Sequence, residues 1–205
     1  GELTFQVRPA ANADVTLSES DFDSNEGRIH VRGGGSNISV AITNVDVTNQ
    51  GGPAQPAVEA YDVEILDIDG LNVTSDTAPI GLQAYRIGTL TLDGSSFDMN
   101  SNTGSVGVVL YEALGSVTIA TTSISNAGQA GILALAAGTI DLDVDVSGMT
   151  FTGNGANAIT GSAHPGVGFE IAYGDIVTVG EGATPDITGD VTGLSIVQSI
   201  TPESP

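Results

Sequence analysis

Lysine and cysteine are absent from this chain of 205 residues, and basic residues of any kind are scarce. Four arginines face 25 aspartates and glutamates, which gives a formal net charge of −21 at pH 7. A surface this negative repels phosphate backbones and anionic lipid head groups, so we expect no nucleic-acid partner and no binding to acidic membranes. Without cysteine, disulfide bonds and thiol chemistry are excluded.

Long apolar runs are also missing. The longest, such as residues 131–137, fall far short of the roughly 20 residues that a membrane-spanning helix needs, so we expect no membrane insertion. Tryptophan is absent, whereas 28 glycines suit tight turns between short strands. The acidic surface is easiest to reconcile with an extracellular or cell-surface medium, where salt or calcium screens or bridges the carboxylates.

A short motif returns along the chain: Ser, Thr or Gly, then Asn or Asp, then any residue, then usually Gly or Ala. Its Asn/Asp positions are Asn25, Asn49, Asp76, Asn102, Asn126, Asn154 and Asp190. The first six copies recur roughly every 26 residues, a period typical of stacked solenoids. Around each copy the sequence carries apolar alternations of period two, which indicate strands with one buried face.

These patterns predict an all-β fold: a single-stranded right-handed parallel β-helix (β-solenoid) of about seven coils of roughly 26 residues, with three short strands per coil. We expect one domain over residues 1–205, with a first coil at 1–27, repeats at 28–197 and a tail at 198–205. The inward residues of the second strand are expected to form one column: Leu17, Val40, Leu66, Leu92, Ile119 and Val144.

This layout resembles the right-handed parallel β-helix proteins of the pectate-lyase-like superfamily, in which an asparagine commonly stacks on itself at one turn. The resemblance covers roughly residues 3–197 and concerns the scaffold. It implies that the Asn/Asp positions of the motif form a structural ladder along the axis, broken at Asp76 and Asp190.

Enzymes of that superfamily cleave acidic polysaccharides, either with a carboxylate-bound Ca²⁺ and a basic residue or with paired aspartates supported by His and Arg/Lys. Neither set can be assembled from this sequence. Arg28 and Arg32 have no matching carboxylate cluster that the repeat spacing places on neighbouring coils. We therefore expect no catalytic residues and no enzymatic activity.

All four tyrosines directly follow the first strand of a repeat, at Tyr61, Tyr85, Tyr111 and Tyr173. On successive coils about 4.8 Å apart, they are expected to form an aromatic stripe, with Leu135 interrupting it before Tyr173. Two interpretations stay open: the stripe binds sugar rings or a partner surface, or it only staples the turn between two strands.

Three aspartates, Asp141, Asp143 and Asp145, alternate with apolar residues and are expected to point outward from one strand. Neighbouring carboxylates then lie roughly 7 Å apart, too far for all three to hold one ion. They form either a solvated face or a weak Ca²⁺ site that uses two carboxylates and water. No cofactor is required.

The leading functional hypothesis is a non-catalytic extracellular structural or adhesive solenoid that stacks end to end into filaments or forms part of a larger surface protein. No capping helix is expected at either end, so the terminal coils are candidates for β-stacking between copies. The residues concerned are Leu3, Phe5, Val7, Leu194 and Ile196. The alternatives are a carbohydrate-binding module that uses the tyrosine stripe, and a degenerate polysaccharide lyase or glycoside hydrolase.

Overall fold

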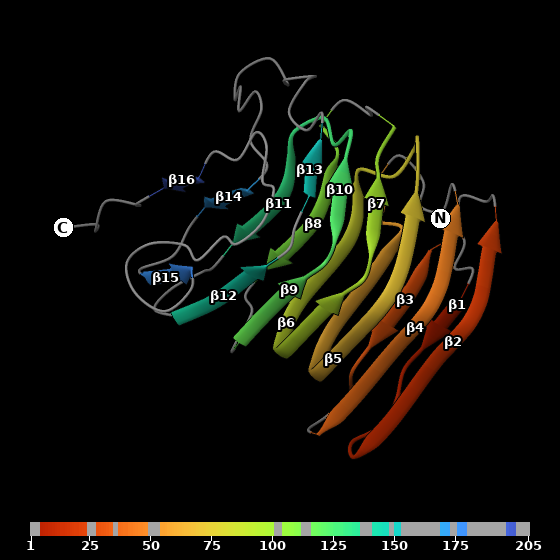
Figure 1. Cartoon of the computed structure of the whole chain (residues 1–205). Helices are drawn as coiled ribbons and strands as arrows, with labels where there is room; N and C mark the ends of the chain where they lie inside the picture. Colours follow the sequence, from red (N-terminus) through yellow and green to blue (C-terminus); the bar gives the residue numbers. More distant parts are fainter. Residues whose placement is uncertain are drawn as a thin grey trace.

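The computed structural model describes residues 5–23, 28–34, 37–48, 54–100, 104–111, 116–135, 141–147, 150–152, 169–172, 176–179 and 196–199. Within these ranges the chain forms strands and turns without a helix, and all pairings between strands are parallel (Figure 1). The predicted parallel β-solenoid is confirmed. None of the described segments is a helix long and apolar enough to cross a membrane.

The strands form three parallel stacks. The first stack contains β1 (Phe5–Val7), β3 (Ile29–Arg32), the starts of β5 (Val58–Thr74) and β6 (Ile80–Asp93), β8 (Val106–Tyr111), β11 (Ala130–Leu135), β14 (Phe169–Ala172) and β16 (Ile196–Ser199). The second stack contains the first part of β2 (Ala13–Asp23) and of β4 (Ile38–Thr48), the middle of β5, the end of β6, β9 (Ser116–Ala120), β12 (Asp141–Ser147) and β15 (Ile176–Val179). The third contains the ends of β2, β4 and β5, followed by β7 (Ser96–Asp98), β10 (Ser123–Ser125) and β13 (Thr150–Thr152).

Several strands run through more than one stack, where the sequence predicts separate short strands. At the bend between the second and third stacks, one residue in each described coil adopts the left-handed conformation, with φ between 46° and 72°. These residues are Glu19, Asn44, Gly70, Gly94 and Thr121. A single left-handed residue turns the chain, and at Glu19, Asn44 and Gly70 the strand continues around the corner. At Gly94 and Thr121 the strand ends instead, and β7 and β10 begin after the bend.

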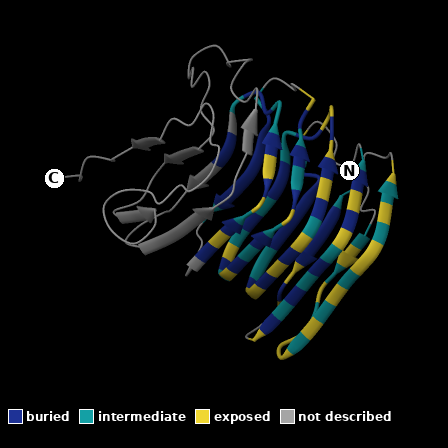
Figure 2. Cartoon of the chain, in the orientation of Figure 1, coloured by how far each residue is buried: buried dark blue, intermediate teal, exposed yellow. Residues whose placement is uncertain are grey.

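The core lies inside the stacks, where inward apolar residues form continuous columns (Figure 2). The second stack has two such columns rather than one. One column is Val15, Val40, Leu66, Leu90 and Val117, and the other is Leu17, Ile42, Ile68, Leu92 and Ile119. The backbone register continues from Val117 to Val144 and from Ile119 to Val146. The predicted single column is therefore wrong, since it mixes members of both. A shift of two residues keeps the same face of a strand inward, so alternation alone does not set the register.

A column of glycines lets the third stack approach the first. Gly81, Gly107 and Gly131 occupy equivalent positions on β6, β8 and β11. A Cβ atom at Gly107 would lie 2.4 Å from Cγ2 of Ile124, and one at Gly81 would lie 2.8 Å from Cδ1 of Phe97. Both neighbours are fully buried, so these strand positions accept only glycine.

Candidate functional site

The candidate site is the outer face of the first stack, called here the first-stack face. Two rows of side chains run along it from coil to coil. One row is His30, Glu59, Gln83 and Val109, and the other is Arg32, Tyr61, Tyr85 and Tyr111. The residues between the rows, such as Val31 and Ala60, are part of the core, so the alternation of the strands directs both rows outward.

Three tyrosines of the second row lie on successive coils, and their rings stack along this face. The ring centroids of Tyr61 and Tyr85 lie 5.1 Å apart with the planes tilted by 58°, and those of Tyr85 and Tyr111 lie 5.0 Å apart with the planes only 15° from parallel. Leu135 follows Tyr111 in the row and pairs with Ala172. Tyr173, which the sequence places in this row, lies outside the described residues, so its part in the row stays a prediction.

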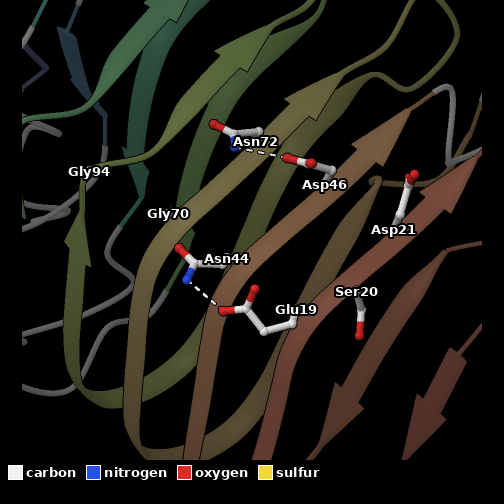
Figure 3. Close-up of a pocket in the computed structure, with 8 residues that line it drawn as sticks. All are labelled: Glu19, Ser20, Asp21, Asn44, Asp46, Gly70, Asn72 and Gly94. Carbon is white, nitrogen blue, oxygen red and sulfur yellow. Dashed lines mark hydrogen bonds between the residues drawn. The ribbon is translucent and has the colours of Figure 1, made fainter.

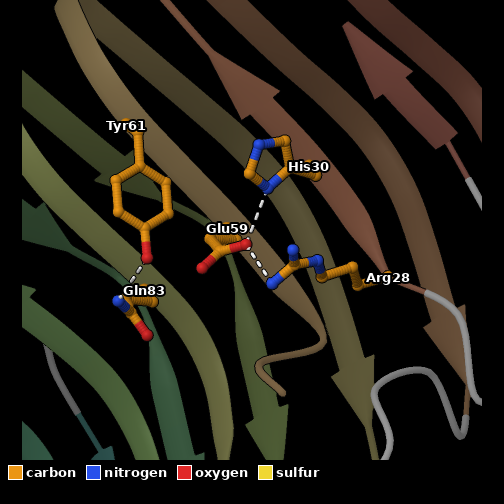
Figure 4. A network of polar contacts seen from close by, with 5 residues as sticks. All are labelled: Arg28, His30, Glu59, Tyr61 and Gln83. Carbon is orange, nitrogen blue, oxygen red and sulfur yellow. Dashed lines mark hydrogen bonds and ion pairs between the residues drawn. The ribbon is translucent and has the colours of Figure 1, made fainter. Parts of the chain in front are cut away.

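A buried carboxylate, Glu59, organises the polar row (Figure 4). It is only 4% exposed, and its Oε2 accepts from Nη1 of Arg28 at 2.5 Å and from Nδ1 of His30 at 2.7 Å. The sequence analysis looked for a carboxylate cluster near Arg28, and it missed this single carboxylate on the neighbouring coil. His30 and Glu59 are 29 residues apart because an insertion lengthens this repeat, which hides the pairing from the 26-residue period. A local sequence signal could have revealed the pairing, because His30 and Glu59 each stand between two inward apolar residues of a first strand.

Two buried nitrogen atoms next to this carboxylate have no hydrogen-bond partner among the described residues: Nε of Arg28 and Nε2 of His30. The whole of His30 is only 6% exposed. Buried polar atoms in proteins are nearly always paired, so an unpaired atom at this position calls for an explanation.

Both residues line a cavity of about 360 Å³ on the first-stack face. Its lining consists of Arg28, His30, Arg32, Glu59, Tyr61, Asp62, Tyr85 and Arg86. The cavity therefore joins the first two rings of the tyrosine row to three of the four arginines in the chain. Glu59 and Asp62 of the same lining balance two of these three charges.

The three arginines of the cavity differ in their partners. Arg86 pairs with Asp62, with Nη2 and Oδ1 2.5 Å apart, and its guanidinium carbon lies 4.8 Å from the ring centroid of Tyr85. Arg28 is paired with Glu59. Arg32 is exposed, and no carboxylate of the described coils pairs with it.

Tyr61 links the two rows, because its hydroxyl oxygen accepts a hydrogen bond from Nε2 of Gln83 at 3.0 Å. Burial, followed by the hydrogen bond and negative charge of Glu59, raises the pKa of Tyr61 from 10.0 to about 12. All three effects disfavour the phenolate, so the neutral phenol is the form that this face accommodates.

Alkaline titration tests this environment of Tyr61. Because the pKa is raised in the folded state, the resulting stabilisation is complete below pH 10 and is lost as the pH rises towards 12. The difference between the phenolate absorbance curves of the wild type and Tyr61→Phe should have its midpoint near 12. The Tyr61→Phe variant should also lose less stability between pH 10 and 12 than the wild type. A difference curve centred near 10 would contradict the burial of this hydroxyl.

The predicted asparagine ladder lies mostly outside the described residues, which applies to Asn25, Asn49, Asn102, Asn154 and Asp190. Of the two remaining members, Asp76 is exposed, and Asn126 donates through Nδ2 to Oδ1 of Asp98 at 2.9 Å. The ladder as a whole stays a prediction.

Hydrogen bonds from asparagine side chains do join neighbouring coils, but at positions outside the repeated Asn/Asp motif. Nδ2 of Asn44 donates to Oε1 of Glu19 at 2.7 Å, and Nδ2 of Asn72 donates to Oδ1 of Asp46 at 2.9 Å (Figure 3). These residues line a polar groove of about 450 Å³ together with Ser20, Asp21, Gly70 and Gly94. Sequence reasoning missed them because an outward amide on a strand has no turn signal beside it.

The remaining predicted positions are described only in part. Asp141, Asp143 and Asp145 belong to β12, which pairs with β9 and β15, and their side chains lie outside the description. The described side chains include no group of three or more His, Asp or Glu residues arranged to hold a metal ion. Phe5 and Val7 are half-buried in β1, and Ile196 begins β16, whereas Leu3 and Leu194 lie outside the described residues.

Comparison with known proteins finds no matching family model, no similar curated protein and no similar solved structure. The function is therefore inferred from the chemistry of the first-stack face.

Proposed function

We propose that this protein is a non-catalytic β-solenoid that binds a polysaccharide on its first-stack face. One observation carries the proposal: Tyr61, Tyr85 and Tyr111 form a continuous row along the coils, and the first two also line a cavity. Tyrosine is well suited to such a role, because a rigid ring with a polar hydroxyl offers a large contact area at a small cost in conformational entropy.

The way the rings are stacked indicates what they present to a ligand. Tyr85 and Tyr111 each cover one face of the other, so the rim of the row consists of ring edges and hydroxyl groups. Ring edges carry partial positive charge, and hydroxyls both donate and accept hydrogen bonds. A rim of this kind suits a ligand that is rich in oxygen atoms. Because the row repeats about every 4.8 Å along the axis, it favours a linear polymer with repeating units over a single small molecule.

A binding role without catalysis is supported by the state of Glu59. This carboxylate is buried and is held by both Arg28 and His30, which favours a structural role as their shared acceptor. We further propose an extracellular or cell-surface location, and a scaffold of the right-handed pectate-lyase-like type. The acidic composition supports the location, and the three parallel stacks support the scaffold. We also propose Ca²⁺ as a ligand of the acidic surface.

Affinity electrophoresis against a panel of soluble polysaccharides tests the proposal, with calorimetry on those that retard the protein. Tyr85→Ala should weaken binding about tenfold or more, equivalent to about 1.4 kcal/mol, because it interrupts the row at its centre. Tyr85→Phe keeps the ring and should lose less. Ile65→Ala is the matched control, since it shortens an exposed apolar side chain of the second stack, 46% exposed, and should bind normally. Wild-type binding by Tyr85→Ala, or no retardation by any polysaccharide, would contradict the proposal.

Assembly through the first coil is the second candidate function. In the described part of the chain β1 pairs only with β3, and β2 pairs only with β4, so one edge of each has no partner. Val15, Leu17 and Phe22 of this coil are only half-buried, which favours a further coil or a second copy packed against them. The exposed Asp14 and Asp21 of β2 favour a partner edge of lower negative charge than β2 itself. Electron microscopy of the purified protein would show whether filaments form.

A further inference from the structure

We propose that Arg86 is a positioning residue of the tyrosine row: together with Asp62, it holds the ring of Tyr85 in the orientation that a bound polysaccharide meets. This inference rests on the proposed function and deepens it, because it assigns Arg86 to the tyrosine ring and not to the ligand. Its elements are the ion pair of Arg86 with Asp62 and the contact of the Arg86 guanidinium with Tyr85.

The surroundings of the Tyr85 ring supply the first argument. Its centroid lies 5.1 Å from the ring centroid of Tyr61, 5.0 Å from that of Tyr111 and 4.8 Å from the guanidinium carbon of Arg86. The face of an aromatic ring attracts a cation, and the planar guanidinium of arginine is the cationic group that stacks best on it. Arg86 therefore restrains the middle ring of the row.

The ion pair supplies the second argument. An arginine side chain has many rotamers, so its guanidinium holds a ring in place only if the guanidinium is itself held. Nη2 of Arg86 lies 2.5 Å from Oδ1 of Asp62 on the neighbouring coil. The two side chains are 43% and 29% exposed, and ion pairs this open to water add little to stability. The orientation that the pair gives to the guanidinium explains it better than a contribution to folding.

The backbone supplies the third argument. Asp62 and Arg86 directly follow Tyr61 and Tyr85, at equivalent positions of β5 and β6. Both adopt the left-handed conformation, with φ of 54° and 50°. Arginine does not favour this conformation, which persists where surrounding contacts fix it and is found most often beside functional sites. For Arg86, the contacts with Asp62 and Tyr85 are two such restraints.

Two variants test the inference, Asp62→Asn and Arg86→Met. NMR scalar couplings report the χ1 rotamer of Tyr85 without any ligand, and calorimetry measures the affinity for a polysaccharide that retards the wild type in affinity electrophoresis. Tyr85 should hold one rotamer in the wild type and average over several in both variants. Both variants should bind the polysaccharide about two- to tenfold more weakly, because binding must then order the side chain. Since the two substitutions change the net charge in opposite directions, a loss in both could not come from net charge.

Thr89→Asp is the matched control, because it makes the same change of net charge as Arg86→Met at an exposed position of β6. It should keep both the single Tyr85 rotamer and the wild-type affinity. The Asp62→Asn and Arg86→Met variants should melt close to the wild type, because the pair is largely open to water, so weaker binding could not come from unfolding.

The possible failures are distinguishable. Rotamer averaging of Tyr85 already in the wild type, or a single rotamer in both variants, would overturn the inference while the proposed function stands. Averaged rotamers together with wild-type affinity would overturn the role of Arg86 in binding. If no polysaccharide bound the wild type, the proposed function would fail, and the role of Arg86 in binding would fail with it.

Discussion

Replacing Leu92 with aspartate should cost more than about 4 kcal/mol of folding free energy, which is a large share of the 5–15 kcal/mol typical of a domain. Leu92 is fully buried, and in its column it lies between Ile68 on one coil and Ile119 on the next. A carboxylate at this position has no donor or cation within the column. It would be buried either as an unpaired charge or as an unpaired acid.

Thermal and urea unfolding of Leu92→Asp measure this cost. In a chain of this length the loss should lower the melting temperature by about 10 °C or more. Thr89→Asp introduces the same group three residues earlier at an exposed position and should unfold within about 0.5 kcal/mol of the wild type. If both variants melted alike, Leu92 would not be an inward residue and the register of the second stack would be wrong.

The second large effect is expected at Glu59. Replacing it with leucine leaves the guanidinium of Arg28 and the imidazole of His30 without their shared acceptor, in a place where both side chains are largely buried. Removing one partner of a buried ion pair generally costs 3–5 kcal/mol. The Arg28 side chain is still 23% exposed, so water partly solvates its charge. We therefore expect Glu59→Leu to lower the free energy of unfolding by about 3 kcal/mol, the lower end of this range.

A double variant separates the free energy lost with the ion pair from the free energy lost with side-chain packing. Arg28→Met combined with Glu59→Leu removes both charges and fills similar volume, so it should recover most of the stability lost by Glu59→Leu alone. Chemical denaturation of the wild type, the two single variants and the double variant gives the coupling free energy of the pair. Additive losses, with no recovery in the double variant, would show that Arg28 and Glu59 do not interact in solution.

The fold was predictable because its main signals repeat. Each coil repeats the same apolar alternation, which indicates strands and the inward face, whatever the details of the turns. The register was not predictable, because Val40 and Ile42 both face inward and differ only by a shift of two residues. The left-handed bend was not predictable either. At this bend Glu19 and Thr121 adopt the same left-handed conformation as Gly70, although neither residue type favours it.

The candidate site was predictable where one residue type recurs at one position, and hidden where different types meet. The tyrosine row repeats a single residue type and therefore stands out in the sequence. The contact of His30 and Arg28 with Glu59 joins three residue types across an insertion, and the repeat period does not place them together. Only the pairing of β3 with β5 brings Glu59 opposite His30 and shows that the few basic residues gather on one face.

Ligand titration followed by NMR tests the central claim most directly, with labels on the tyrosine rings and on the arginine Nε groups. On addition of a polysaccharide that retards the protein in affinity electrophoresis, the signals of Tyr61, Tyr85 and Tyr111 should shift together and saturate, and the Nε signal of Arg86, which lies over the Tyr85 ring, should follow the same curve. The Nε signal of Arg8, which does not line the cavity, should stay unchanged. Saturable shifts that leave the three tyrosines untouched, or no shift at any ligand concentration, would contradict a binding site on the first-stack face.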